Sequence, residues 1–154
     1  MANITVEQVH GVTIVLISGK LTFEEAIDTI NNYYHMVTRH IIWDFTDGDA
    51  TQITPDQFRK IILTANEYRP FKEDGKTAYV STVDSTYGMA RMFSILAEFS
   101  DIPYPHRAFR DFEEAVEWLH SPPPLYPVSA RKLRMKNERF PIRKDGMIIS
   151  SIRQ

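Results

Sequence analysis

Short apolar runs recur along the first 110 residues and predict five strands. Residues 4–9 alternate weakly between apolar and polar positions, and residues 12–18 form an almost continuous apolar run. Gly11 lies between these two runs, which is typical of a hairpin. We therefore expect the first strand to join the sheet as an antiparallel edge. Three further strand candidates cover residues 40–45, 76–82 and 106–110.

Segments of helical length lie between the strand candidates. Each repeats apolar residues at steps of three and four, which places these residues on one face of a helix. The four segments are residues 23–38, 55–68, 86–100 and 112–120. In the third segment the apolar face consists of Met89, Met92, Phe93, Leu96 and Phe99. Strands that alternate with helices predict an α/β fold with a small, mostly parallel sheet, about four helices and right-handed crossovers.

Three of the four predicted helices begin with a self-capping pattern. In such a capping box, the side chain of a threonine or aspartate accepts a hydrogen bond from the backbone three residues later. The acidic or amide side chain at that later position bonds back to the cap. The three pairs are Thr22 with Glu25, Thr54 with Gln57 and Asp111 with Glu114.

The helix that follows residues 76–82 begins differently. Asp84 or Ser85 would be its cap, but neither has a glutamate or glutamine three residues later. Gly88 lies in the expected first turn, where glycine costs about 1 kcal/mol of helix propensity relative to alanine. Two explanations stay open: the turn packs tightly against the neighbouring strand, or a ligand approaches its exposed amides. The junction lies beyond the carboxyl end of a parallel strand, where α/β proteins bind ligands.

This junction supplies the candidate ligand-binding residues. Arg91 follows Tyr87 by four positions, so the two side chains share a helix face. The guanidinium could stack on the tyrosine ring, for about 0.5–1 kcal/mol, or turn toward an anion at the start of the helix. The neighbouring loop, residues 44–54, adds an acidic side chain. The predicted site residues are Ser85, Thr86, Tyr87, Gly88 and Arg91, together with Asp47.

Composition limits the class of protein. The 154 residues, 43% hydrophobic and 25% charged, are enough for one globular domain with a real core. The longest apolar run, residues 12–17, is too short to span a bilayer. The first ten residues show no export leader, so we expect a cytoplasmic location. The absence of cysteine excludes disulfides, thiol catalysis and thiolate metal sites.

The sequence divides into residues 1–120, the α/β domain, and residues 121–154, a proline-rich linker with a basic extension. The charge is uneven, because the first part carries −8 and the second +6. We favour mutual attraction of the two parts over binding of nucleic acid or an anionic membrane. Asp145-Gly146 predicts a hairpin over residues 140–152, which must dock to be stable. It could cover the sheet edge of its own domain or of a second protomer in a homodimer.

Other chemistry has weak support. Residues 44–49, with the sequence DFTDGD, place three carboxylates after a strand. They form either a solvated turn in which Gly48 has positive φ or a divalent-metal site of an enzyme, our alternative function. The five histidines lack the spacing of a metalloprotease site, and no phosphate loop or nucleophile elbow occurs. The sequence therefore assigns no catalytic residue, metal ligand or cofactor.

Two motifs carry a resemblance to a known family. YGMAR at residues 87–91 and FRDFEEAVEWL at residues 109–119 resemble the SpoIIAA-like proteins of the STAS (anti-sigma-factor antagonist) superfamily. The resemblance covers roughly residues 3–120. It implies a β-α superhelix with a mixed sheet and a non-enzymatic module. It also implies binding of a partner protein or of a small ligand, such as a nucleotide.

The sequence departs from the family at its regulatory serine. The relatives with a phosphorylation switch carry that serine at the start of the helix after the third strand. Residues 43–58 of this chain lack the motif, and the nearest hydroxyls belong to Thr51 and Thr54. Thr54 is better explained as a helix cap. We therefore expect a cytoplasmic, non-catalytic, STAS-like module for a partner protein or a small anionic or amphiphilic ligand, without the serine switch.

Overall fold

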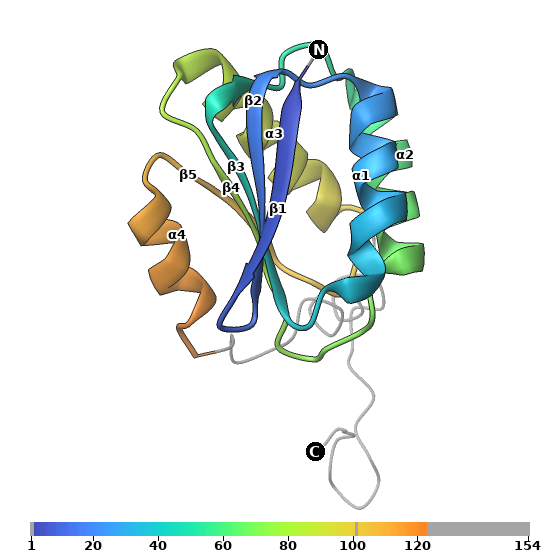
Figure 1. Cartoon of the computed structure of the whole chain (residues 1–154), viewed down its shortest axis with the longest axis vertical. Helices are drawn as coiled ribbons and strands as arrows, with labels where there is room; N and C mark the ends of the chain where they lie inside the picture. The colour runs from blue at the N-terminus through green and yellow to red at the C-terminus, as the bar shows by residue number, and fades with distance from the viewer. Residues whose placement is uncertain (1, 101, 123–154) are drawn as a thin grey trace, which may run out of the picture.

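The computed structural model describes residues 2–100 and 102–122, which form a sheet flanked by helices (Figure 1). The order of elements agrees with the order expected from the sequence. The elements are β1 (Asn3–Val9), β2 (Val12–Lys20), α1 (Phe23–Tyr33), a short 3-10 helix (Tyr34–Met36), β3 (His40–Asp49), α2 (Pro55–Tyr68), β4 (Thr77–Val80), α3 (Asp84–Glu98), β5 (His106–Phe109) and α4 (Phe112–Leu119).

The strands lie in the sheet in the same order as in the sequence. β1 is antiparallel to β2, and β2 to β5 are mutually parallel, as expected. His10 and Gly11, with φ of 49° and 81°, make the predicted two-residue hairpin, in which both turn residues need positive φ. Each later connection leads to the next strand on the same side of the preceding strand, so the sheet grows in one direction from β2 to β5. Because such crossovers are right-handed, α1, α2 and α3 lie on the same face of the sheet.

The alternation of side chains along the strands separates two hydrophobic clusters. Ile41 and Trp43 of β3 point toward α1, α2 and α3 and belong to the larger cluster. Ile42, between them, points to the opposite face. That face is covered by α4 (Figure 1), which contributes Ala115 and Leu119 to the smaller cluster. Both faces of the central strands are therefore buried, which explains the nearly continuous apolar runs in β2 and β3.

The acidic segment at residues 44–49 differs from the expected loop. β3 continues to Asp49 and pairs with an extension of β2 as far as Lys20. Gly48 lacks the positive φ that a turn would have required, so this part of the prediction is wrong. The α-hydrogen that takes the place of a side chain at Gly48 points toward β2. A Cβ at this position would lie 2.9 Å from the carbonyl oxygen of Ile17. Gly48 is explained by close packing of two strands.

The helix ends agree with most of the expected caps. Thr22 and Thr54 both form the complete capping box. Asp111 accepts a hydrogen bond from the amide of Glu113, without the predicted bond back from Glu114. Phe99 was expected on the apolar face of α3, but it follows the last residue of this helix and is 79% exposed. No helix in the described ranges has the length and apolar character needed to cross a membrane.

The predictions for the linker and the basic extension lie outside the described residues, apart from positions 121 and 122. The terminal hairpin, the homodimer and the domain boundary near residue 120 therefore stay predictions.

Candidate functional site

The junction between β4 and α3 is the first candidate site. α3 begins at Asp84 after Val83, whose side chain makes no capping hydrogen bond. The prediction that this helix lacks a capping box is thus confirmed, whereas the expectation that Asp84 or Ser85 would be the cap is wrong. Asp84 instead places its carboxylate in the first turn, near the positive end of the helix dipole. It accepts a 2.6 Å hydrogen bond from Arg110, beyond the end of β5.

Tyr87 belongs to α3, and its ring lies beside Arg110 at the end of β5. The guanidinium carbon of Arg110 is 4.2 Å from the centre of the Tyr87 ring, so a cation stacks on this ring as expected. The cation comes from Arg110, however, and not from Arg91, for which stacking on Tyr87 was one of the two possibilities. The three side chains of Asp84, Tyr87 and Arg110 together connect the beginning of α3 to the end of β5.

Gly88 faces solvent. A Cβ built at this position would meet no atom within 4 Å. The explanation that the first turn packs tightly against a strand is therefore wrong. Gly88 opens a stripe along the exposed face of α3 that continues through Arg91 and Ile95 to Phe99, at helical spacing.

The remaining predicted site residues have different environments. Thr86 is buried, and its hydroxyl accepts a 3.3 Å hydrogen bond from the amide of Ala50. This hydrogen bond joins α3 to the segment after β3. The two segments were expected to be neighbours. Ser85 is exposed beside Gly88, and Asp47 is exposed on β3. The structure thus brings Tyr87 and Arg91 to one surface and gives Thr86 a structural role.

That surface is a groove between α3 and the free edge of β5, which we call the α3–β5 groove. No other strand pairs with this edge of β5 among the described residues. The carbonyl oxygens of Pro105 and Phe109 accept hydrogen bonds from the β4 side of the sheet. Because the backbone N–H and C=O groups of successive residues in a strand point in opposite directions, those of Ala108 face away from β4. The groove is lined by Tyr87, Arg91, Ser94, Ile95, Glu98, His106, Arg107 and Ala108.

A second hollow lies on the other side of β5, next to α4. It shares Tyr87, Arg107 and Ala108 with the first groove and adds Glu114, Glu117 and Trp118, among others. Sequence reasoning missed Ile95 and Arg107. Ile95 could have been found, because it is an apolar residue off the core face of α3. The role of Arg107 depends on β5 being the last strand of the sheet, which no local pattern reveals.

The acidic segment has local partners. One carboxylate oxygen of Asp44 accepts two hydrogen bonds from Thr46, and one of Asp49 does the same with Thr51. The hydrogen bonds from Thr51 lower the pKa of Asp49. In the part of the chain that the structure describes, no group of three or more acidic or histidine side chains could hold a metal ion.

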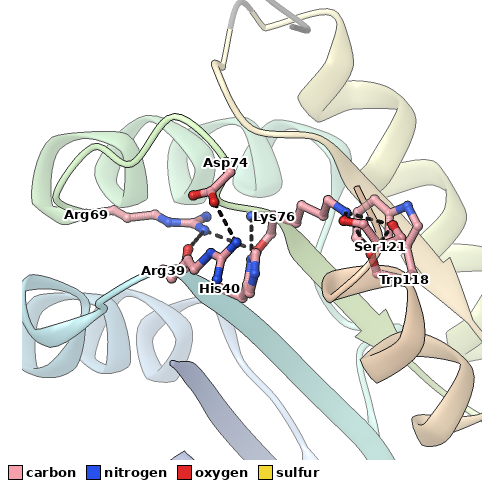
Figure 2. Close-up of polar contacts among 7 residues, drawn as sticks. All are labelled: Arg39, His40, Arg69, Asp74, Lys76, Trp118 and Ser121. Atoms are coloured by element: carbon pink, nitrogen blue, oxygen red, sulfur yellow. Dashed lines mark hydrogen bonds and ion pairs between the residues drawn. The ribbon is translucent and has the colours of Figure 1, made fainter. Parts of the chain in front are cut away.

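Buried cations gather at the opposite end of the sheet, where the parallel strands begin (Figure 2). The ammonium group of Lys76 donates to the carbonyl oxygens of Trp118 and Ser121, at 2.7 and 3.1 Å. It thereby satisfies the carboxyl end of α4 and places a positive charge there. The neighbouring His40 accepts a hydrogen bond from the backbone amide of Lys76. Nothing in the sequence marks these charged residues as buried.

Among the comparisons with known proteins, only the comparison with solved structures found a similar protein. No family model and no curated protein sequence matches the chain. A solved structure is similar over 79% of this chain and 96% of its own, with a TM-score of 0.55 and 16% identity. It is the crystal structure of an anti-sigma factor antagonist from Mycobacterium paratuberculosis. The chain therefore has the α/β fold of the anti-sigma factor antagonists, the STAS fold that the sequence predicted.

Proposed function

We propose that this protein is a non-catalytic regulatory module that binds a partner protein in the α3–β5 groove. One observation carries the proposal: no described strand pairs with the outer edge of β5, and this edge lies between two hollows, each lined by Tyr87. The likeness to an anti-sigma factor antagonist, a protein named for a regulatory role, supports the same class of function. The cytoplasmic location expected from the sequence belongs to this proposal.

The groove suits an extended segment of a partner. The outward peptide groups at Ala108 can pair with an added strand, a recurring mode of peptide recognition. Arg91 and Arg107 supply positive charge, whereas Glu98 supplies negative charge. Ile95, on the exposed face of α3, offers an apolar contact. Such a surface provides contacts for recognition rather than groups arranged for a reaction.

The absence of cysteine allows a site-specific test. We would introduce Ile95→Cys, attach a photoreactive group and irradiate the protein in an extract of the source cells. The matched control is Leu63→Cys on α2, an exposed apolar position outside the groove. We expect a discrete adduct from position 95 only.

A second variant tests the mode of binding. Ala108→Pro removes an amide that faces away from β4, so it spares the sheet hydrogen bonds. We expect it to abolish the adduct while circular dichroism stays unchanged. Equal adducts from positions 63 and 95, or an adduct that survives Ala108→Pro in a folded protein, would contradict the proposal.

A further inference from the structure

A small cavity lies inside the larger hydrophobic cluster and shares one lining residue, His106, with the α3–β5 groove. Its volume is about 40 Å³, which exceeds the roughly 10–15 Å³ that one water molecule needs. Most of its wall consists of buried apolar and aromatic side chains from the sheet, α2 and α3. The polar members of the wall include Tyr34, Arg69 and Thr77.

Arg69 brings a positive charge into this wall. It directly follows α2, and only 8% of its surface is exposed. Its terminal nitrogens donate to the hydroxyl of Thr77 at 2.6 Å and to the carbonyl oxygens of Arg39 and Lys76 at 2.9 and 3.1 Å. The ring of Tyr104 lies 3.9 Å from the guanidinium carbon. All of these partners are neutral.

The charge of Arg69 lacks an acidic partner among the described residues. Its Nε is buried and has no hydrogen-bond acceptor there. Burial lowers the pKa of the guanidinium, but an arginine keeps its proton in proteins. A buried cation without an anion is costly, so this arrangement calls for a negative charge nearby.

Two hydroxyl groups in the same wall also lack acceptors. The hydroxyl of Tyr34 accepts a 2.7 Å hydrogen bond from Trp43, but none of the described residues accepts its own hydrogen. Burial raises the pKa of Tyr34 to about 12, so this hydroxyl remains a donor at neutral pH. The hydroxyl of Thr77 accepts from Arg69 and has no described acceptor for its hydrogen either. Three donors in this wall, on Tyr34, Arg69 and Thr77, therefore lack acceptors among the described residues.

We propose that the cavity binds a small monovalent anion, of the size of chloride, bromide, nitrate or formate. Such an anion accepts a hydrogen bond from Nε of Arg69, with the hydroxyl of Tyr34 as a second donor of the same wall, and neutralises the guanidinium. A water molecule would bring two hydrogens of its own into a site that already lacks acceptors, and it would leave the charge uncompensated. Ala65 and Asn66 are less buried than most of the wall, so the anion enters beside α2.

The first test measures the melting temperature of the chloride-free protein at constant ionic strength. Sodium bromide and sodium nitrate should each raise it in a saturable way, by roughly a few degrees, because the anion binds only the folded state. Sodium gluconate, whose anion is too large for the cavity, serves as the control salt. The same response to all three salts would overturn the proposal.

Substitutions test whether the rise in melting temperature comes from anion binding in the cavity. Tyr34→Phe removes one donor and keeps the ring, so it should weaken the apparent bromide affinity about tenfold. Tyr33→Phe, at the exposed tyrosine next to it in the sequence, should leave that affinity unchanged. Arg69→Met should abolish the bromide response, and Tyr34→Phe keeps the proposal testable if Arg69→Met does not fold. Equal bromide affinities of the two tyrosine variants would overturn the assignment.

Crystals grown in sodium bromide give a direct test. We expect an anomalous peak within hydrogen-bond distance of Nε of Arg69. A water molecule at this position, without an anomalous signal at saturating bromide, would refute the proposal.

Discussion

Two glycines in this protein have opposite reasons for lacking a side chain. Gly88 lies in a regular helix with open space around it, whereas Gly48 lies in β3 against the backbone of β2. From the sequence, a tight contact was one explanation for Gly88 and a turn with positive φ one explanation for Gly48, and neither occurs in the structure. Glycine in a sequence shows that a side chain is absent, but only the neighbouring backbone shows the reason.

The two glycines should respond in opposite directions to alanine. Gly88→Ala should stabilise the protein by up to about 1 kcal/mol, because alanine is the better helix former and meets no neighbour. Gly48→Ala should destabilise it, because the new Cβ would lie 2.9 Å from the carbonyl oxygen of Ile17. Urea denaturation measures both effects. A loss of stability in Gly88→Ala would contradict the exposed position of Gly88.

His40 should make the protein sensitive to mild acid. Burial, together with the charges of Arg39 and Lys76, lowers the pKa of His40 from 6.5 to about 4, and this outweighs the opposite effect of Asp74. Above pH 6.5 neither state binds the proton and stability is complete. Between pH 6.5 and 4 the unfolded chain takes up the proton first, so the free energy of unfolding falls by at most about 1.4 kcal/mol per pH unit.

Denaturation curves at pH 7.5, 6.0 and 5.0 check this expectation. His40→Asn keeps an acceptor for the amide of Lys76 but cannot titrate, so it should flatten the acid-side loss. His35→Asn, at an exposed position, is the matched control and should keep the slope of the wild type. An equal loss in wild type and His40→Asn would show that another group causes it.

At the scale of elements, α4 depends on a side chain from another part of the chain. Lys76 precedes β4, yet its ammonium group bonds to the end of α4 through Trp118 and Ser121. The helix itself has no basic residue in its last turn. The lysine therefore adds a polar link, across 42 to 45 positions of sequence, to the apolar contacts that hold α4 on the sheet.

Lys76→Met should loosen this contact. Methionine fills a similar volume without a donor, so the carbonyl oxygen of Ser121 loses its partner and that of Trp118 keeps only its bonds from Ser121, at a cost of about 1–3 kcal/mol. Tryptophan fluorescence should also change, since the Lys76 ammonium lies 5.1 Å from the centre of the Trp118 ring. The control is Lys72→Met, at an exposed lysine nearby in the sequence. Equal stability of the two variants would argue against the capping role of Lys76.

The fold of the whole molecule could be predicted to a large extent from local patterns. Alternating strands and helices gave the element order and the parallel sheet, and the hairpin at Gly11 gave its antiparallel edge. The capping pairs located the beginnings of α1 and α2. The end of β3 was missed, because its last residues are polar and glycine-containing and join the sheet only through β2.

The candidate site could be predicted only in part. Tyr87 and Arg91 were found because the helix that holds them begins unlike the others, and both line the α3–β5 groove. Arg107 comes from β5, and the partner of Tyr87 is Arg110 rather than its neighbour on the helix. A sequence pattern describes one element at a time, whereas a groove is formed by two elements.

By itself, the sequence determined the order and type of the elements, because helix caps, turn residues and apolar periodicity act within a few residues along the chain. Only the tertiary structure decided which strand edge has no partner among the described residues, which glycine is crowded and which charges are buried. Arg69 shows the reason most clearly: its burial, its neutral partners and its cavity come from segments that meet only when the sheet and helices pack.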